Sequence, residues 1–129
     1  MHTSKSARKA LSKARRRARR LGLEDEARQI LFCYDLSTSK CASKKRMRRS
    51  WKFLKKRLKE LKLDKHGGIL RTKTYCLEIC SGGPIAVVYP DGVWYGGCDP
   101  PVLEKILEQH VIGGRVVKEF VLARAPRCE

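Results

Sequence analysis

Apolar residues recur at helical spacing along a short segment near the start of the chain. They form a thin stripe made mostly of alanine: Ala7, Ala10, Leu11, Ala14, Ala18 and Leu21. Ser6 stands where a residue would cap the start of this helix, and Gly22 stands where a glycine would end it. A stripe this shallow cannot anchor a core, so the pattern predicts a solvated helix.

A second helical pattern begins at Ser43. Met47, Trp51, Leu54, Leu58 and Leu61 step by four, three, four and three residues, which places them on one face of a helix. The Gly67-Gly68 pair ends this segment. The pattern predicts one long helix with a single apolar face.

Short apolar and aromatic runs predict strands at residues 29–34, 69–75, 85–89 and 93–95. Pro90-Asp91-Gly92 predicts a tight turn between the last two runs. Asp99 followed by two prolines predicts the start of a further helix. Its buried face is expected to hold Leu103, Ile106, Leu107, His110 and Val111. The expected order is strand, helix, strand, strand, strand, helix.

Charge changes the interpretation of both helical segments. The 129 residues suit one domain, and they carry a formal net charge of +17 with a pI of about 10.1. Residues 1–22 hold nine basic residues and no acid: Lys5, Arg8, Lys9, Lys13, Arg15, Arg16, Arg17, Arg19 and Arg20. The face of the long helix opposite its apolar stripe is basic from Lys44 to Lys62. Such charge favours nucleic acid, an anionic membrane surface or an acidic protein as a partner.

The chain shows no secretory signal and no apolar stretch approaching 18 residues. The sequence therefore predicts a cytoplasmic protein without a membrane span. Six cysteines in a reducing compartment are more often metal ligands or redox groups than disulfides.

Two cysteine pairs stand out: Cys33-x7-Cys41 and Cys76-x3-Cys80. Four thiolates suit tetrahedral zinc or a [2Fe-2S] cluster. Zinc sites usually use tight pairs on both sides, whereas a two-iron cluster accepts unequal loops. Spacing alone leaves the cluster, zinc, disulfides and simply buried thiols open. Cys98 and Cys128 are expected to be structural and free, respectively.

The sequence around the second pair resembles a known family. Residues 72–95, which read TKTYCLEICSGGPIAVVYPDGVWY, resemble the thioredoxin-like (Shethna-type) [2Fe-2S] ferredoxins, as do residues 108–115 followed by Val117. The resemblance covers residues 29–124. Residues 1–28 form a basic helical extension outside it, and residues 125–129 form a tail.

The resemblance implies an α/β fold, a thioredoxin-like two-layer sandwich with a small mixed sheet and two packed helices. It implies one [2Fe-2S] cluster as cofactor, with Cys33, Cys41, Cys76 and Cys80 as ligands. The implied function is one-electron transfer with a partner protein. Relatives suggest a homodimer, for which the Trp94-Tyr95 hairpin edge offers an apolar contact.

The residues around the cysteines suggest how the protein would set the reduction potential of the cluster. Lys40, Lys44 and Lys45 flank the second ligand, and backbone N–H groups at Ser81–Gly83 are placed to donate to sulfur. Both features stabilise the reduced, more negative form and raise the potential. The basic surface further suggests an acidic redox partner.

No enzyme motif is present in the sequence, neither a Gly-rich nucleotide loop nor a C-x2-C dithiol. His2, His66 and His110 are interpreted as structural residues. The competing hypothesis is a metal- or cluster-stabilised nucleic-acid-binding module that uses residues 1–22 and 44–62. No aromatic residue interleaves the first 28 positions as a base-stacking platform would need.

Overall fold

The computed structural model describes residues 4–23, 28–38, 40–64 and 68–126. Five strands form one mixed sheet in the spatial order β2-β1-β3-β4-β5. Strands β1 and β2 are parallel, and the other neighbours are antiparallel. The strands are β1 (Gln29–Cys33), β2 (Leu70–Thr74), β3 (Ala86–Tyr89), β4 (Val93–Tyr95) and β5 (Val121–Arg124).

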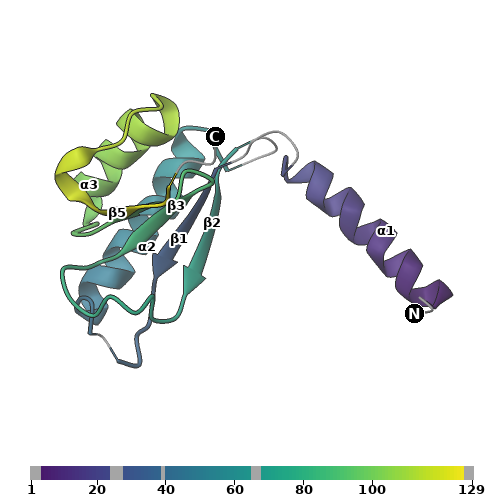
Figure 1. The fold of residues 1–129 in the computed structure, drawn as a ribbon, viewed down its shortest axis with the longest axis horizontal. Coiled ribbons are helices and arrows are strands. Elements are labelled where there is room, and N and C mark those ends of the chain that lie inside the picture. Colours follow the sequence, from purple (N-terminus) through teal and green to yellow (C-terminus); the bar gives the residue numbers. More distant parts are fainter. Residues whose placement is uncertain (1–3, 24–27, 39, 65–67, 127–129) are drawn as a thin grey trace.

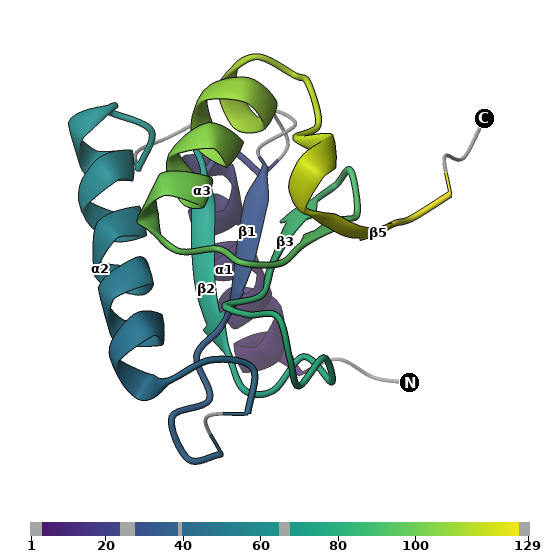
Figure 2. The ribbon, with the colours of Figure 1, turned by 90° about the vertical axis from the view of Figure 1, so that its left-hand side faces the viewer.

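The helices of the domain cover one face of the sheet. They are α2 (Lys44–Glu60) and α3 (Pro100–Lys105), which the π-helical segment η1 (Ile106–Ile112) continues. Figure 1 shows α2 and α3 on the same side of the strands, and Figure 2 looks through them onto the sheet. This two-layer α/β arrangement confirms the fold class expected from the sequence.

The apolar stripe of α2 packs on the sheet as its spacing predicts. The Ser43 hydroxyl accepts a hydrogen bond from the Arg46 N–H at 3.2 Å and caps the helix. Met47, Trp51, Leu54 and Leu58 are buried. Phe32 of β1 packs against Trp51 with ring centroids 6.0 Å apart. Burying four large side chains stabilises this layer by about 1.5–3 kcal/mol each.

The C-terminal part of the chain differs from the expectation. A fifth strand, β5, which the sequence pattern does not predict, follows the short 3-10 turn η2 (Lys118–Phe120) and pairs with β4. Its four residues show no clear alternation and only Val121 is half-buried. Because β5 covers the edge of β4, the Trp94-Tyr95 edge is not open for an apolar dimer contact, and Tyr95 is fully buried.

The helix α1 (Lys5–Arg20) stands apart from the sheet, on the side opposite α2 (Figure 1, Figure 2). Ser4, rather than the expected Ser6, caps it by accepting a hydrogen bond from the Ala7 N–H at 3.1 Å. None of its residues is buried, as the thin alanine stripe predicts. No helix in the described part of the chain is long and apolar enough to cross a membrane.

Candidate iron–sulfur site

The parallel pairing of β1 and β2 brings the two halves of the site to one sheet edge. Cys33 is the last residue of β1, and it lies in register with Thr74, the last residue of β2. The Tyr34 N–H donates to the Thr74 carbonyl at 2.9 Å, which continues the pairing past the strand ends. Cys76 follows two residues later, so its loop begins beside Cys33.

The first thiol pair is buried. The sulfurs of Cys33 and Cys41 are 3.3 Å apart, and the residues are 1% and 7% exposed. The Gly83 N–H donates to the Cys41 carbonyl at 2.9 Å. A Cβ at Gly83 would lie 2.7 Å from that carbonyl oxygen, so only glycine allows this approach. Cys41 is therefore held by the loop that follows the second pair.

The second thiol pair faces solvent. The sulfurs of Cys76 and Cys80 are 3.9 Å apart, and Cys80 is exposed. Glu78 adopts a left-handed backbone conformation with φ of 69°, and its N–H donates to the Cys76 sulfur at 3.3 Å. The sequence places such donors at Ser81–Gly83, but the Gly83 N–H is directed at the Cys41 carbonyl instead.

A small apolar cluster joins the two pairs. Cys33, Cys41 and Met47 belong to it, and Leu77 and Ile79 of the second loop pack against it. The thiols nevertheless stand as two pairs: within the described ranges, no three cysteine, histidine or acidic side chains are close enough to hold one metal ion together. A single zinc ion needs all four ligands around one centre.

The separation within each pair fits a shared tetrahedral metal. Metal–sulfur bonds of about 2.3 Å place two sulfurs on one tetrahedral ion roughly 3.8 Å apart. The Cys76–Cys80 distance of 3.9 Å matches, and the Cys33–Cys41 distance of 3.3 Å needs to widen slightly. Two pairs, each able to take one metal, suit a two-iron centre with two thiolates per iron.

The surroundings raise the pKa of two of the four thiols, those of Cys41 and Cys80, and so favour their protonated form. Burial, together with the hydrogen bond to Cys33, raises the pKa of the Cys41 thiol to about 12. The hydrogen bond to Cys76 raises the pKa of Cys80, while the positive charge of Lys40 acts in the opposite direction. Coordination to metal deprotonates thiols outright, so metal would displace these protons.

Arg46 connects three segments around the site through hydrogen bonds, and the sequence does not indicate this role. Its guanidinium donates to the Asp99 carboxylate at 2.8 and 3.1 Å and to the Gly83 carbonyl at 2.8 Å. It therefore ties the start of α2, the loop at Gly83 and the start of α3 together. In the sequence Arg46 is one more cation on the basic face of the helix, because only the folded chain brings Asp99 beside it.

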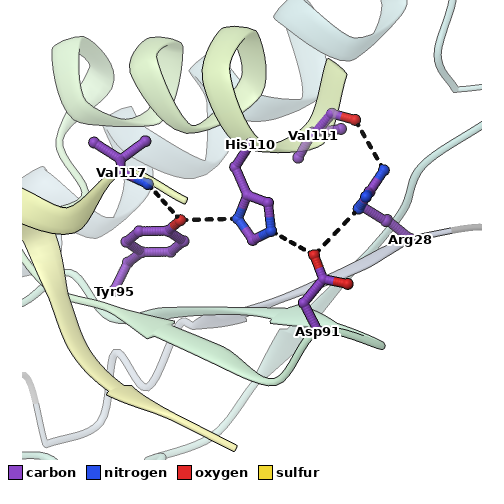
Figure 3. A network of polar contacts seen from close by, with 6 residues as sticks. All are labelled: Arg28, Asp91, Tyr95, His110, Val111 and Val117. Atoms are coloured by element: carbon purple, nitrogen blue, oxygen red, sulfur yellow. Dashed lines mark hydrogen bonds and ion pairs between the residues drawn. The ribbon is translucent and has the colours of Figure 1, made fainter. Parts of the chain in front are cut away.

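His110 lies in a network of polar contacts with Tyr95 and Asp91 (Figure 3). The Tyr95 hydroxyl contacts His110 Nδ1 at 2.8 Å, and His110 Nε2 contacts the Asp91 carboxylate at 2.5 Å. The Val117 N–H donates to the Tyr95 oxygen, and Arg28 donates to Asp91 and to the Val111 carbonyl. The histidine is 1% exposed with both ring nitrogens engaged, which supports its interpretation as structural.

Cys98 lies apart from the two thiol pairs. Cys98 is fully buried in the main core, and burial raises the pKa of its thiol. Cys128, His2 and His66 lie outside the described residues.

The fold resembles that of one class of protein. A structure of the thioredoxin-like [2Fe-2S] ferredoxin from Aquifex aeolicus matches with a TM-score of 0.66 and 27% identity, over 79% of this chain and 96% of that chain. A wild-type crystal structure of the same protein at 1.5 Å resolution matches with a TM-score of 0.64 and 28% identity, over 76% and 98%. No model of a protein family matches the chain.

Two curated proteins show the same likeness in sequence. The 2Fe-2S ferredoxin of Aquifex aeolicus (strain VF5) is 45% identical over 53 residues, which are 41% of this chain and 48% of the relative. The 2Fe-2S ferredoxin of Clostridium pasteurianum is 47% identical over 57 residues, or 44% and 56%. The chain thus matches about half the length of its curated relatives. These findings confirm the resemblance that the sequence motifs predict.

Proposed function

We propose that this chain is a one-electron carrier with one [2Fe-2S] cluster held by Cys33, Cys41, Cys76 and Cys80. The observation that carries the proposal is the pairing of the thiols at one sheet edge, 3.3 and 3.9 Å apart. The names of the similar ferredoxins support the same cofactor. The free thiols suit a reducing, cytoplasmic compartment.

The bound cluster would supply reversible one-electron reduction of iron. The residues around it exclude water on one side and admit a partner on the other. Cys33 and Cys41 are buried against Met47, whereas Cys80 is exposed, so electrons would exchange through the Cys76–Cys80 side. The Glu78 N–H that points at the Cys76 sulfur would stabilise added negative charge.

A basic surface lies next to this exposed edge. Lys40 acts electrostatically on Cys80, and the exposed Lys44 and Lys45 begin α2 shortly after Cys41. We infer that the redox partner carries an acidic surface, because complementary charge accelerates encounter. Salt would slow electron transfer to such a partner.

Replacing Lys40 with glutamine is expected to lower the reduction potential. Reduction adds one negative charge, which the nearby lysine stabilises, so removing the lysine favours the oxidised form. At a partly exposed site the effect is on the order of tens of millivolts. A redox titration monitored in the visible range measures it. Lys118→Gln removes the same charge from the exposed η2 turn and serves as the matched control. Equal reduction potentials for wild type and Lys40→Gln would contradict the proposed effect of Lys40 on the cluster.

The proposed function is tested directly by the colour and metal content of the purified protein. We expect a red-brown protein with visible charge-transfer absorption, iron and acid-labile sulfide in equal amounts, and an electron-spin signal after one-electron reduction. A colourless protein with stoichiometric zinc would refute the cluster and support the zinc alternative.

A further inference from the structure

The helix α1 is strongly basic and contributes no buried residue to the core of the ferredoxin-like domain. It carries nine cations and no acid, and none of its residues is buried. Three acids form ion pairs inside the domain: Asp91 with Arg28, Asp99 with Arg46 and Glu104 with Arg57. These three carboxylates therefore do not neutralise the cations of α1 between Lys5 and Arg19.

The spacing of these cations works against the helix itself. Lys9 and Lys13, like Arg15 and Arg19, are like charges four residues apart. Each such pair destabilises a helix by about 0.2–0.5 kcal/mol. At 16 residues, α1 is only just longer than the roughly 12–15 residues below which isolated helices are marginal in water. No buried residue of α1 offsets this repulsion between like charges. A bound polyanion would offset it and stabilise the helix.

The cations surround much of the helix. At 100° per residue, they span an arc of about 200°, with Arg15 at one side of the arc and Arg17 at the other. Lys9, Lys13 and Arg16 line one shallow hollow with Ser6 and Ala10, toward the Arg17 side of the arc. A flat acidic surface contacts only one side of a helix. Charges on both sides fit a groove with two anionic walls.

We propose that α1 binds double-stranded DNA through its phosphate backbone, without sequence preference. A helix with its side chains is about 10–12 Å wide, and the major groove of B-DNA is about 12 Å wide. Phosphates line both walls of that groove, so cations on both sides of the helix reach them. Backbone contacts of this kind carry affinity but no sequence information.

The structure argues against other polyanions. The uncharged side of α1 is mostly alanine and offers two bulky side chains, Leu11 in the helix and Leu21 at its C-cap, which are too few to insert into a membrane surface. The helix has no aromatic residue on which single-stranded bases could stack. The major groove of duplex RNA is deep and narrow. Duplex DNA is therefore the partner that the geometry favours.

The test compares matched variants of the full chain. The variant Arg15→Gln/Arg17→Gln/Arg19→Gln removes three charges from α1. The variant Lys52→Gln/Lys56→Gln/Lys59→Gln removes three exposed charges from α2, across the sheet. Both have the same net charge, and glutamine is a good helix former. The variant Arg15→Lys/Arg17→Lys/Arg19→Lys keeps the charge of α1.

Fluorescence anisotropy with a mixed-sequence DNA duplex of about two helical turns measures affinity over a range of salt concentrations. The α1 glutamine variant is expected to lose at least about tenfold in affinity. Its plot of log affinity against log salt should become less steep, with the magnitude of the slope smaller by about three. The α2 variant should lose less than about threefold, and the lysine variant should bind like wild type. Circular dichroism should show helix content rising as duplex is added to wild type.

Specific outcomes would overturn the proposal. Equal losses in the α1 and α2 variants would mean that net charge alone drives binding. Equal or tighter binding of polyglutamate, duplex RNA, single-stranded DNA or phosphatidylserine vesicles would assign the helix to a different partner. The absorbance of the cluster is recorded in the same samples, so failure here is distinguishable from failure of the proposed electron-carrier function.

Discussion

Alanine substitution of any one of the four paired cysteines is expected to abolish the visible absorbance of the protein. Each thiolate would supply one of the two protein ligands of an iron, so its loss leaves that iron undercoordinated. Loss of a direct ligand should lower the metal affinity by more than the roughly 10- to 100-fold that changes in outer-shell residues typically cost. The iron content of each purified variant should therefore fall by at least about tenfold. Iron and sulfide analysis of the four single variants measures this.

Cys98→Ala is the matched control for this series. Cys98 is fully buried in the main core, apart from the cluster that holds Cys33 and Cys41, and it is a small apolar side chain there. We expect this variant to keep its iron and its colour and to lose about 1 kcal/mol of stability. Retention of full iron by any of the four site variants would remove that residue from the ligand set. Loss of iron in Cys98→Ala with a folded domain would contradict the division of the cysteines.

Tyr95→Phe is expected to destabilise the fold by about 1–3 kcal/mol without changing the cluster. The hydroxyl bridges the buried Val117 N–H and His110 Nδ1, and its removal leaves both without this partner. Denaturant unfolding measures the loss as a lower midpoint at constant slope. An unchanged midpoint would mean that water replaces the hydroxyl.

The same network is expected to make stability depend on acid pH through Asp91. Burial raises the pKa of this carboxyl, but the hydrogen bond from His110 and the charge of Arg28 outweigh it and lower the pKa below 3.8. A lowered pKa in the folded state contributes stability above the unfolded value. That contribution is lost as pH falls through the folded value, so the wild type should weaken below about pH 4.

Asp91→Asn should be less stable than the wild type near pH 7 and should show a shallower decline in acid, because the ionisable group is gone. Asp64→Asn is the matched control, since Asp64 is exposed. Free energies of unfolding measured from pH 2.5 to 7 compare the three proteins, with the range set by the ordinary carboxyl pKa of about 4. Parallel curves for wild type and Asp91→Asn would contradict the role of this carboxylate.

Periodicity alone predicts much of the domain. The stripe from Met47 to Leu58 and the cap at Ser43 fix α2, and the apolar runs fix β1 to β4. The strand β5 is not predictable in this way, because its residues are mostly exposed and only pairing with β4 makes them a strand. The apolar spacing after Asp99 predicts one helix, and it does not predict that the helix becomes π-helical from Ile106 to Ile112.

For the cysteines, too, the sequence predicts one part of the site and the tertiary structure decides the other. Their spacing, with the motif around Cys76 and Cys80, indicates which four thiols to consider. The sequence cannot show that Cys33 and Cys41 are buried while Cys80 faces solvent, because that depends on which loops pack over the end of the sheet. Nor can it show that Arg46 joins Asp99 to the Gly83 loop, since those contacts span up to 53 residues.

The sequence by itself determined the elements, the pairs of cysteines and the basic character of α1, because each of these depends on residues close together along the chain. The tertiary structure decided which thiols are accessible, which charges are paired and which edge is covered. Those properties depend on contacts between distant segments, and only the pairing of β1 with β2 and the packing of α2 and α3 on the sheet bring such segments together.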